Sequence, residues 1–124
     1  MDNIGDMDRV DVALVDLEIA IKISKVSKKV FVIPNDNRNL LVTEDVFGDV
    51  AEVSEVGFVE LNSILYGGKN TGNLYEIIKK YDRSIIVCLH GVMAMDFVLA
   101  LRELGSHAYC LKGGADMLMR RQSK

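Results

Sequence analysis

Three short and almost entirely apolar runs constrain the fold of this chain more than any other feature of its sequence. They are Val30–Ile33, which ends at Pro34, Ser84–Leu89, which His90 and Gly91 interrupt, and His107–Leu111. An apolar run without polar alternation is typical of a strand buried on both faces, as in a parallel sheet. Segments of helical character lie between the runs, so the sequence predicts an α/β protein.

We expect one domain over residues 1–124, with a central, mainly parallel sheet of four or five strands and helices on both faces. The chain is 49% hydrophobic, which is enough to form one core, and no linker or internal repeat divides it. Residues 1–10 are polar and acidic, so they are a candidate flexible N-terminal segment and not a secretory signal.

The segments between the apolar runs carry apolar residues at helical spacing. We predict helices over residues 12–26, from Thr43 to about Val50, from a cap at Asn70 or Thr71 to Tyr81, over Val92–Leu104 before Gly105, and over Ala115–Arg121. The weakly alternating stretch Gly57–Leu61 is a candidate strand. Residues 35–39 are predicted to form an exposed loop, because Asn and Asp favour turns.

Charge and composition exclude several classes of function. The net charge of -3 supplies no basic field for nucleic acid, and no apolar run is long enough to cross a membrane. Two cysteines are too few for a secreted disulfide scaffold, so we expect reduced thiols in the cytoplasm. Without a Cys-x-x-Cys motif, and with only two histidines, the sequence predicts no metal site.

Cys88 is the strongest candidate for chemistry. Ligands in open parallel sheets bind beyond the carboxyl ends of the strands, and Cys88 lies there, just before the helix predicted to begin at Val92. Loop amides and a helix N-terminus stabilise a thiolate or an anionic persulfide. The amides expected to hold the sulfur are those of Leu89, His90, Gly91, Val92, Met93 and Ala94.

Each of these features also has a structural interpretation. Cys88 can be a small buried hydrophobic residue, as Cys110 in the middle of its predicted strand is expected to be. His90 either orients a donor or is a solvated loop residue. Met93 and Met117 are candidates for an exposed apolar patch beside Cys88.

The segment Ser84–Met119 resembles the C-terminal half of rhodanese-like sulfurtransferase domains. It reads SIIVCLHGVMAMDFVLALRELGSHAYCLKGGADMLM. The matching parts are an apolar strand ending in Cys, a six-residue loop with Gly at its fourth place, a helix ending Leu-Gly, and Leu-Lys-Gly-Gly. The N-terminal half matches in outline: Asp36 and Arg38 echo an Asp-x-Arg segment, and Gly57 alone matches the Gly-His-Ile-x-Gly-Ala signature.

The resemblance implies a sulfurtransferase or sulfur carrier that holds a persulfide on Cys88 and needs no cofactor. Its partners would be a sulfur donor, either polysulfide or a protein persulfide, and a thiol acceptor. A Cys-x5-Arg phosphatase shares this loop geometry but needs an Arg, which the loop lacks. The same lack of a loop cation leaves an alternative open: a non-catalytic rhodanese-like module that binds a protein partner through the apolar loop around Cys88.

Overall fold

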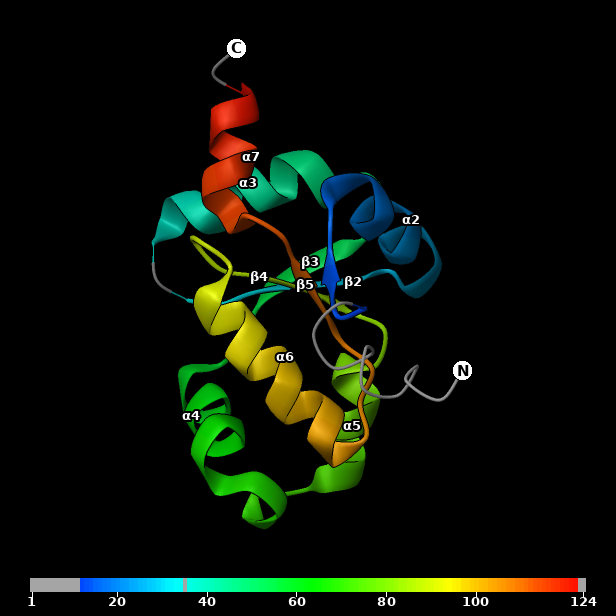
Figure 1. Cartoon of the computed structure of the whole chain (residues 1–124), viewed down its shortest axis with the longest axis vertical. Coiled ribbons are helices and arrows are strands. Elements are labelled where there is room, and N and C mark those ends of the chain that lie inside the picture. Colours follow the sequence, from blue (N-terminus) through cyan, green and yellow to red (C-terminus); the bar gives the residue numbers. More distant parts are fainter. Residues whose placement is uncertain (1–11, 35, 123–124) are drawn as a thin grey trace.

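The computed structural model describes residues 12–34 and 36–122, and in them a five-stranded parallel sheet lies between two layers of helices (Figure 1). The strands are β1 (Leu14–Val15), β2 (Lys29–Val32), β3 (Glu52–Glu55), β4 (Ile85–Val87) and β5 (Tyr109–Leu111). Their order is β1-β5-β4-β2-β3, and each pair is parallel. The predicted α/β class and parallel sheet are confirmed. The prediction for residues 1–10 lies outside the described residues.

Helices cover both faces of the sheet, as predicted (Figure 1). One face packs against α2 (Leu17–Ser27), α3 (Asn37–Phe47) and α7 (Gly114–Gln122). The other packs against α4 (Phe58–Gly67), α5 (Leu74–Tyr81) and α6 (Val92–Leu104), with the short 3-10 helix η1 (Gly68–Asn70) after α4. In the described residues, no helix combines the length and apolar character needed to cross a membrane.

The central strands are apolar throughout because both of their faces are buried. On β2, Val30 and Val32 point into the core beneath α2, α3 and α7. Phe31 and Ile33, on and just after the same strand, point into the core formed with α4, α5 and α6. Alternate residues therefore enter different cores, which removes the polar alternation of a half-exposed strand.

The prediction of one helix over residues 12–26 was wrong at its start. Leu14 and Val15 form β1, an edge strand that pairs with Cys110 and Leu111. The helix begins after Asp16, whose carboxylate accepts the Ile19 backbone N–H at 3.0 Å. The strand is only two residues long, so its apolar side chains merge with the helical pattern that follows.

The loop predicted over residues 35–39 is largely the start of α3. Asp36 caps this helix by accepting the Arg38 backbone N–H at 2.9 Å, and Asn39 is fully buried. Thr43, predicted as a helix start, lies inside α3, where its hydroxyl donates to the Asn39 carbonyl at 2.6 Å. Asp and Asn serve turns and helix caps alike, and here the cap interpretation holds.

The candidate strand Gly57–Leu61 was also wrong. Gly57 is the N-cap of α4, and Leu61 and Ile64 on that helix are buried at helical spacing. The strand in this region is β3, whose sequence Glu-Val-Ser-Glu has no apolar run. β3 pairs with β2 at the edge of the sheet, where a strand keeps polar side chains in solvent.

The elements around the last two strands agree better with prediction. Helix α6 spans Val92–Leu104 and ends at Gly105 with φ 114°. Helix α7 spans Gly114–Gln122, one residue beyond each end of the predicted helix. Helix α5 is capped by Asn73, which accepts the Glu76 backbone N–H at 3.3 Å, and not by Asn70 or Thr71 as predicted.

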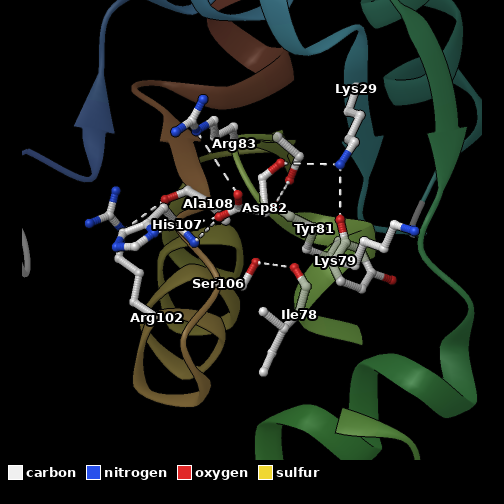
Figure 2. Close-up of polar contacts among 11 residues, drawn as sticks. Lys29, Ile78, Lys79, Tyr81, Asp82, Arg83, Arg102, Ser106, His107 and Ala108 are labelled. Atoms are coloured by element: carbon white, nitrogen blue, oxygen red, sulfur yellow. Dashed lines mark hydrogen bonds and ion pairs between the residues drawn. The ribbon is translucent and has the colours of Figure 1, made fainter. Parts of the chain in front are cut away.

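Side chains close the amino edge of the sheet, where α5 ends (Figure 2). Lys29 Nζ donates to the carbonyls of Lys79 at 2.9 Å and Asp82 at 3.3 Å. The buried Ser106 hydroxyl donates to the Ile78 carbonyl at 3.0 Å. The last carbonyls of a helix have no partners within it, and here side-chain donors satisfy them.

Candidate functional site

Cys88 lies immediately after β4, at the carboxyl edge of the sheet, and is 6% exposed. Its side chain is in the core formed with α4, α5 and α6. The sulfur accepts the backbone N–H groups of Gly91 at 3.1 Å and Ala94 at 3.2 Å. Two of the amides predicted to hold the sulfur therefore contact it directly.

Gly91 makes this loop possible. It is the N-cap of α6 and has φ 93°, a left-handed conformation that side chains disfavour. A Cβ on Gly91 would lie 3.5 Å from the Leu111 carbonyl oxygen, an ordinary contact, so the backbone conformation is what requires glycine here. Ala94 belongs to the first turn of the same helix, so both donors to Cys88 are free amides of a helix N-terminus.

The start of α7 holds the loop from the other side. The Ala115 backbone N–H donates to the Cys88 carbonyl at 2.8 Å, and the Asp116 N–H donates to the Leu89 carbonyl at 2.9 Å. Gly114 permits this approach, because a Cβ there would collide with the Cys88 carbonyl oxygen and lie 2.7 Å from that of Leu89. The loop carbonyls are thus bonded to α7, while loop amides face the sulfur.

Cys110 on β5 is the second thiol in this region, and both cysteines are free. It is fully buried in the same core as Cys88, as its structural interpretation predicted. Burial and, to a smaller extent, the charge of the neighbouring Cys88 raise the pKa of Cys110 to about 12. Cys110 therefore stays protonated near neutral pH.

An apolar groove of about 580 Å³ opens in front of Cys88. Val92 and Met93 lie on its rim and are 72% and 49% exposed. The other lining residues come from the end of β2, from α4, from the loop and from α6: Ile33, Pro34, Phe58, Leu61, Asn62, Leu65, Tyr66, Cys88, Leu89, His90 and Asp96. None of these described lining residues is Lys or Arg.

His90 lines the groove but is largely exposed, and its Nδ1 lies 3.9 Å from Asp116 Oδ2. Arg120 also reaches this carboxylate, at 2.8 Å. The hypothesis that His90 orients a donor stays a prediction. The contact that the structure shows for His90 is with Asp116 on α7.

Three residues that the sequence analysis named, Met117, Asp36 and Arg38, lie away from the groove. Met117 packs on the opposite face of the sheet, so the predicted apolar patch contains Met93 without it. Asp36 and Arg38 form an ion pair at 2.8 Å on α3, which covers that same opposite face. Hydrogen bonds from Arg38 lower the pKa of the Asp36 carboxyl.

Sequence reasoning missed the wall that α4 contributes to the groove. Phe58, Leu61 and Leu65 fall at helical spacing, but the assignment of Gly57–Leu61 as a strand hid that pattern. It also missed the support from Ala115 and Asp116. The Gly113-Gly114 pair was an available signal, because adjacent glycines mark a close approach of two backbone segments as well as a turn.

Among the described residues, no cluster of three or more His, Cys, Asp or Glu side chains is placed to hold a metal ion. Comparison with protein-family models, with curated proteins and with solved structures finds no match to this chain.

Proposed function

We propose that this protein is a rhodanese-like sulfurtransferase or sulfur carrier, with Cys88 as the nucleophile. The observation that carries the proposal is the pair of backbone amides, from Gly91 and Ala94, that donate to the Cys88 sulfur at 3.1 and 3.2 Å. Preorganised amides at a helix N-terminus stabilise negative charge without reorganisation during the reaction. A core cysteine with only a packing role has no need of two such donors.

The reaction is an exchange of one sulfur atom between thiols. The Cys88 thiolate attacks the outer sulfur of a donor persulfide, R–S–SH, and forms a new S–S bond. The donor S–S bond breaks, and its electron pair leaves on R–S⁻, while the proton stays on the transferred sulfur. An acceptor thiolate then attacks this outer sulfur, takes it as R′–S–SH and restores the Cys88 thiolate. No external oxidant, reductant or organic cofactor is required.

The groove favours a donor whose sulfur is attached to an apolar carrier or a polysulfide chain. Thiosulfate is a dianion whose oxygens Lys or Arg would bind, and the described lining residues include neither. Cys88 is 6% exposed, so a donor must reach it between the apolar side chains of α4 and of the loop. We therefore propose a protein persulfide or polysulfide as donor and a thiol as acceptor, in the reducing cytoplasm.

Intact mass spectrometry tests the proposal. Incubation with polysulfide should add about 32 Da, the mass of one sulfur, in a form that dithiothreitol removes. Cys88→Ser should abolish the adduct, whereas Cys110→Ser should retain it. An adduct that maps to Cys110, or no adduct on a folded protein, would refute the assignment of Cys88 as the sulfur carrier.

A second function has one specific observation in its favour. The rim of the groove exposes Phe58, Tyr66 and Val92 by 66%, 83% and 72%. Large exposed apolar side chains gathered around a groove are typical of a protein-binding surface. A non-catalytic module that binds a partner here would lose that binding on Phe58→Ser and would keep it on Cys88→Ser. A sulfur carrier would lose sulfur loading on Cys88→Ser.

A further inference from the structure

Both thiols of the chain form hydrogen bonds with the backbone of Gly91, one with its N–H and the other with its carbonyl. The Gly91 backbone N–H donates to the Cys88 sulfur at 3.1 Å. The Gly91 carbonyl accepts the Cys110 thiol at 3.4 Å, and it also accepts the Met95 backbone N–H at 3.2 Å, which is the first hydrogen bond of α6. The start of α6 is thus bonded to β5 through one carbonyl.

Cys110 is suited to be a permanent donor. It is fully buried, and burial raises the pKa of its thiol to about 12, so it keeps its proton where Cys88 reacts. Its other acceptor, the Leu111 carbonyl, is more distant at 3.8 Å. The surroundings of the two thiols therefore differ. Cys88 lines the groove, through which a donor can reach it, whereas Cys110 is fully buried.

We propose that Cys110 is a positioning residue for Cys88. Its thiol fixes the Gly91 carbonyl against β5 and so holds the first turn of α6 in place, which keeps the Gly91 and Ala94 amides on the Cys88 sulfur. Cys110 does not touch the transferred sulfur. The inference rests on the proposed function only for its biological purpose, because the effect on the reactivity of Cys88 can be measured without any sulfur transfer.

The measurement is the rate of iodoacetamide alkylation of Cys88 in the full chain as a function of pH. Weaker amide contacts stabilise the thiolate less, so Cys88 is alkylated more slowly at a given pH. The titratable groups near Cys88 on the packed elements are Cys110 on β5, Tyr66 on α4, His90 in the loop, Asp96 on α6 and Asp116 on α7. All of them except Cys110 are unchanged in every variant, so they do not produce a difference between variants.

Three variants of Cys110 separate donation from packing. Cys110→Ala removes the donor, and Cys110→Val removes it while keeping apolar volume in the strand. Cys110→Ser keeps a hydroxyl donor. We expect alkylation of Cys88 at pH 7 to slow about threefold in the Ala and Val variants. The Ser variant should stay within about twofold of the unchanged protein.

Ile86→Val is the matched control. Ile86 is the β4 partner of Cys110 in the sheet register, lies in the same core, and loses one carbon where Cys110→Ala loses one sulfur. It makes no polar contact through its side chain, so it should leave the profile unchanged. The proposal is overturned if Ile86→Val shifts the profile as far as Cys110→Ala, or if Cys110→Ser behaves like Cys110→Val.

The outcome is distinguishable from a failure of the proposed function. If Cys88 takes no sulfur but its alkylation still depends on the Cys110 donor, the sulfur-carrier proposal fails and the positioning role stands. If Cys88 loads sulfur and its profile is the same in all Cys110 variants, only the positioning role fails. Near-UV circular dichroism identifies a variant that has not folded, and Cys110→Val then replaces Cys110→Ala as the test.

Discussion

The amino and carboxyl edges of the sheet, where its strands begin and end, are closed by different kinds of group. At the amino edge, side chains form hydrogen bonds with backbone groups. Lys29 and Ser106 donate to carbonyls at the end of α5, and Asp82 accepts the His107 backbone N–H at 2.9 Å (Figure 2). At the carboxyl edge, the donors are backbone amides. Amides at the starts of α6 and α7 donate to the Cys88 sulfur and to the loop carbonyls.

This difference separates stability from chemistry within one small domain. Side-chain donors at the amino edge satisfy the last carbonyls of α5. The carboxyl edge gathers helix N-termini, whose free amides carry partial positive charge, around one sulfur atom. Substitutions at the amino edge should therefore change the free energy of unfolding, whereas glycine substitutions at the carboxyl edge should also change the reactivity of Cys88.

The largest expected effect is that of Gly114→Ala. The new Cβ would collide with the Cys88 carbonyl and would force a side chain into φ 60°, so the loop must move away from α7. We expect sulfur loading of Cys88 to fall at least tenfold and the protein to lose about 3 kcal/mol of stability. Mass spectrometry after polysulfide incubation and urea unfolding measure the two effects.

Gly105→Ala is its matched control at the amino edge. Gly105 has φ 114°, but a Cβ there meets only Ile78 Cδ1 at 3.7 Å. It should lose about 1–2 kcal/mol from backbone strain and keep normal loading of Cys88. Equal loss of loading in both variants would mean that the two edges are not independent.

Ser106→Ala tests the amino edge itself. Ser106 is fully buried, and its removal leaves the Ile78 carbonyl without its donor. We expect a loss of about 2 kcal/mol in the free energy of unfolding, with no change in the alkylation rate of Cys88. A variant with unchanged stability but slower alkylation would contradict the division between the two edges.

Sequence patterns predicted the fold where burial and local signals agree. Residues 92–104 are apolar and are followed by Gly105, so both the helix and its end were predictable. β3 was missed because an edge strand of sequence Glu-Val-Ser-Glu has no apolar face to detect. α4 was mistaken for a strand because its first residues alternate weakly, and this alternation hid the helical spacing of Phe58, Leu61 and Leu65.

The candidate site also has a part that the sequence predicted and a part that it did not. Cys88 and Gly91 lie within four residues of each other, and their relation follows from a local rule about loops between strands and helices. The contacts of Cys110 and Ala115 with that loop join segments about 20 residues or more apart, and no local pattern encodes them. The same is true of the groove wall from α4, which depends on how the helices pack over the sheet.

Met93→Arg tests whether a missing side-chain cation is what prevents the site at the carboxyl edge from using thiosulfate. Met93 is on the rim of the groove and 49% exposed, so an Arg there can remain solvated and reach an anion. We expect thiosulfate turnover to rise about tenfold, because a charge-assisted hydrogen bond contributes about 1.5 kcal/mol. Met93→Gln is the neutral control. No gain in folded Met93→Arg would indicate that the shape of the groove, and not its charge, excludes thiosulfate.

The smallest expected effect is at alkaline pH, and it tests whether the carboxyl edge keeps its second thiol neutral. Burial, with a smaller contribution from the charge of Cys88, raises the pKa of Cys110 from its ordinary 9.0 to about 12, and burial remains in Cys88→Ser. At alkaline pH the folded protein therefore holds a proton that the unfolded chain has lost. This contribution to stability is complete below pH 9 and is lost as the pH rises towards 12.

The measurement compares Cys88→Ser with Cys88→Ser/Cys110→Ser, which keeps Cys88 itself out of the titration. Burial and the Glu60 carboxylate also raise the pKa of Tyr81, but this residue is present in both proteins and cancels in their difference. Between pH 8 and 9.5, the protein that retains Cys110 should lose about 1 kcal/mol more of its free energy of unfolding in urea. Parallel curves for the two proteins would mean that Cys110 ionises as freely in the folded state as in the unfolded chain. The core at the carboxyl edge would then admit a charge, and Cys110 would not be a reliable proton donor to Gly91.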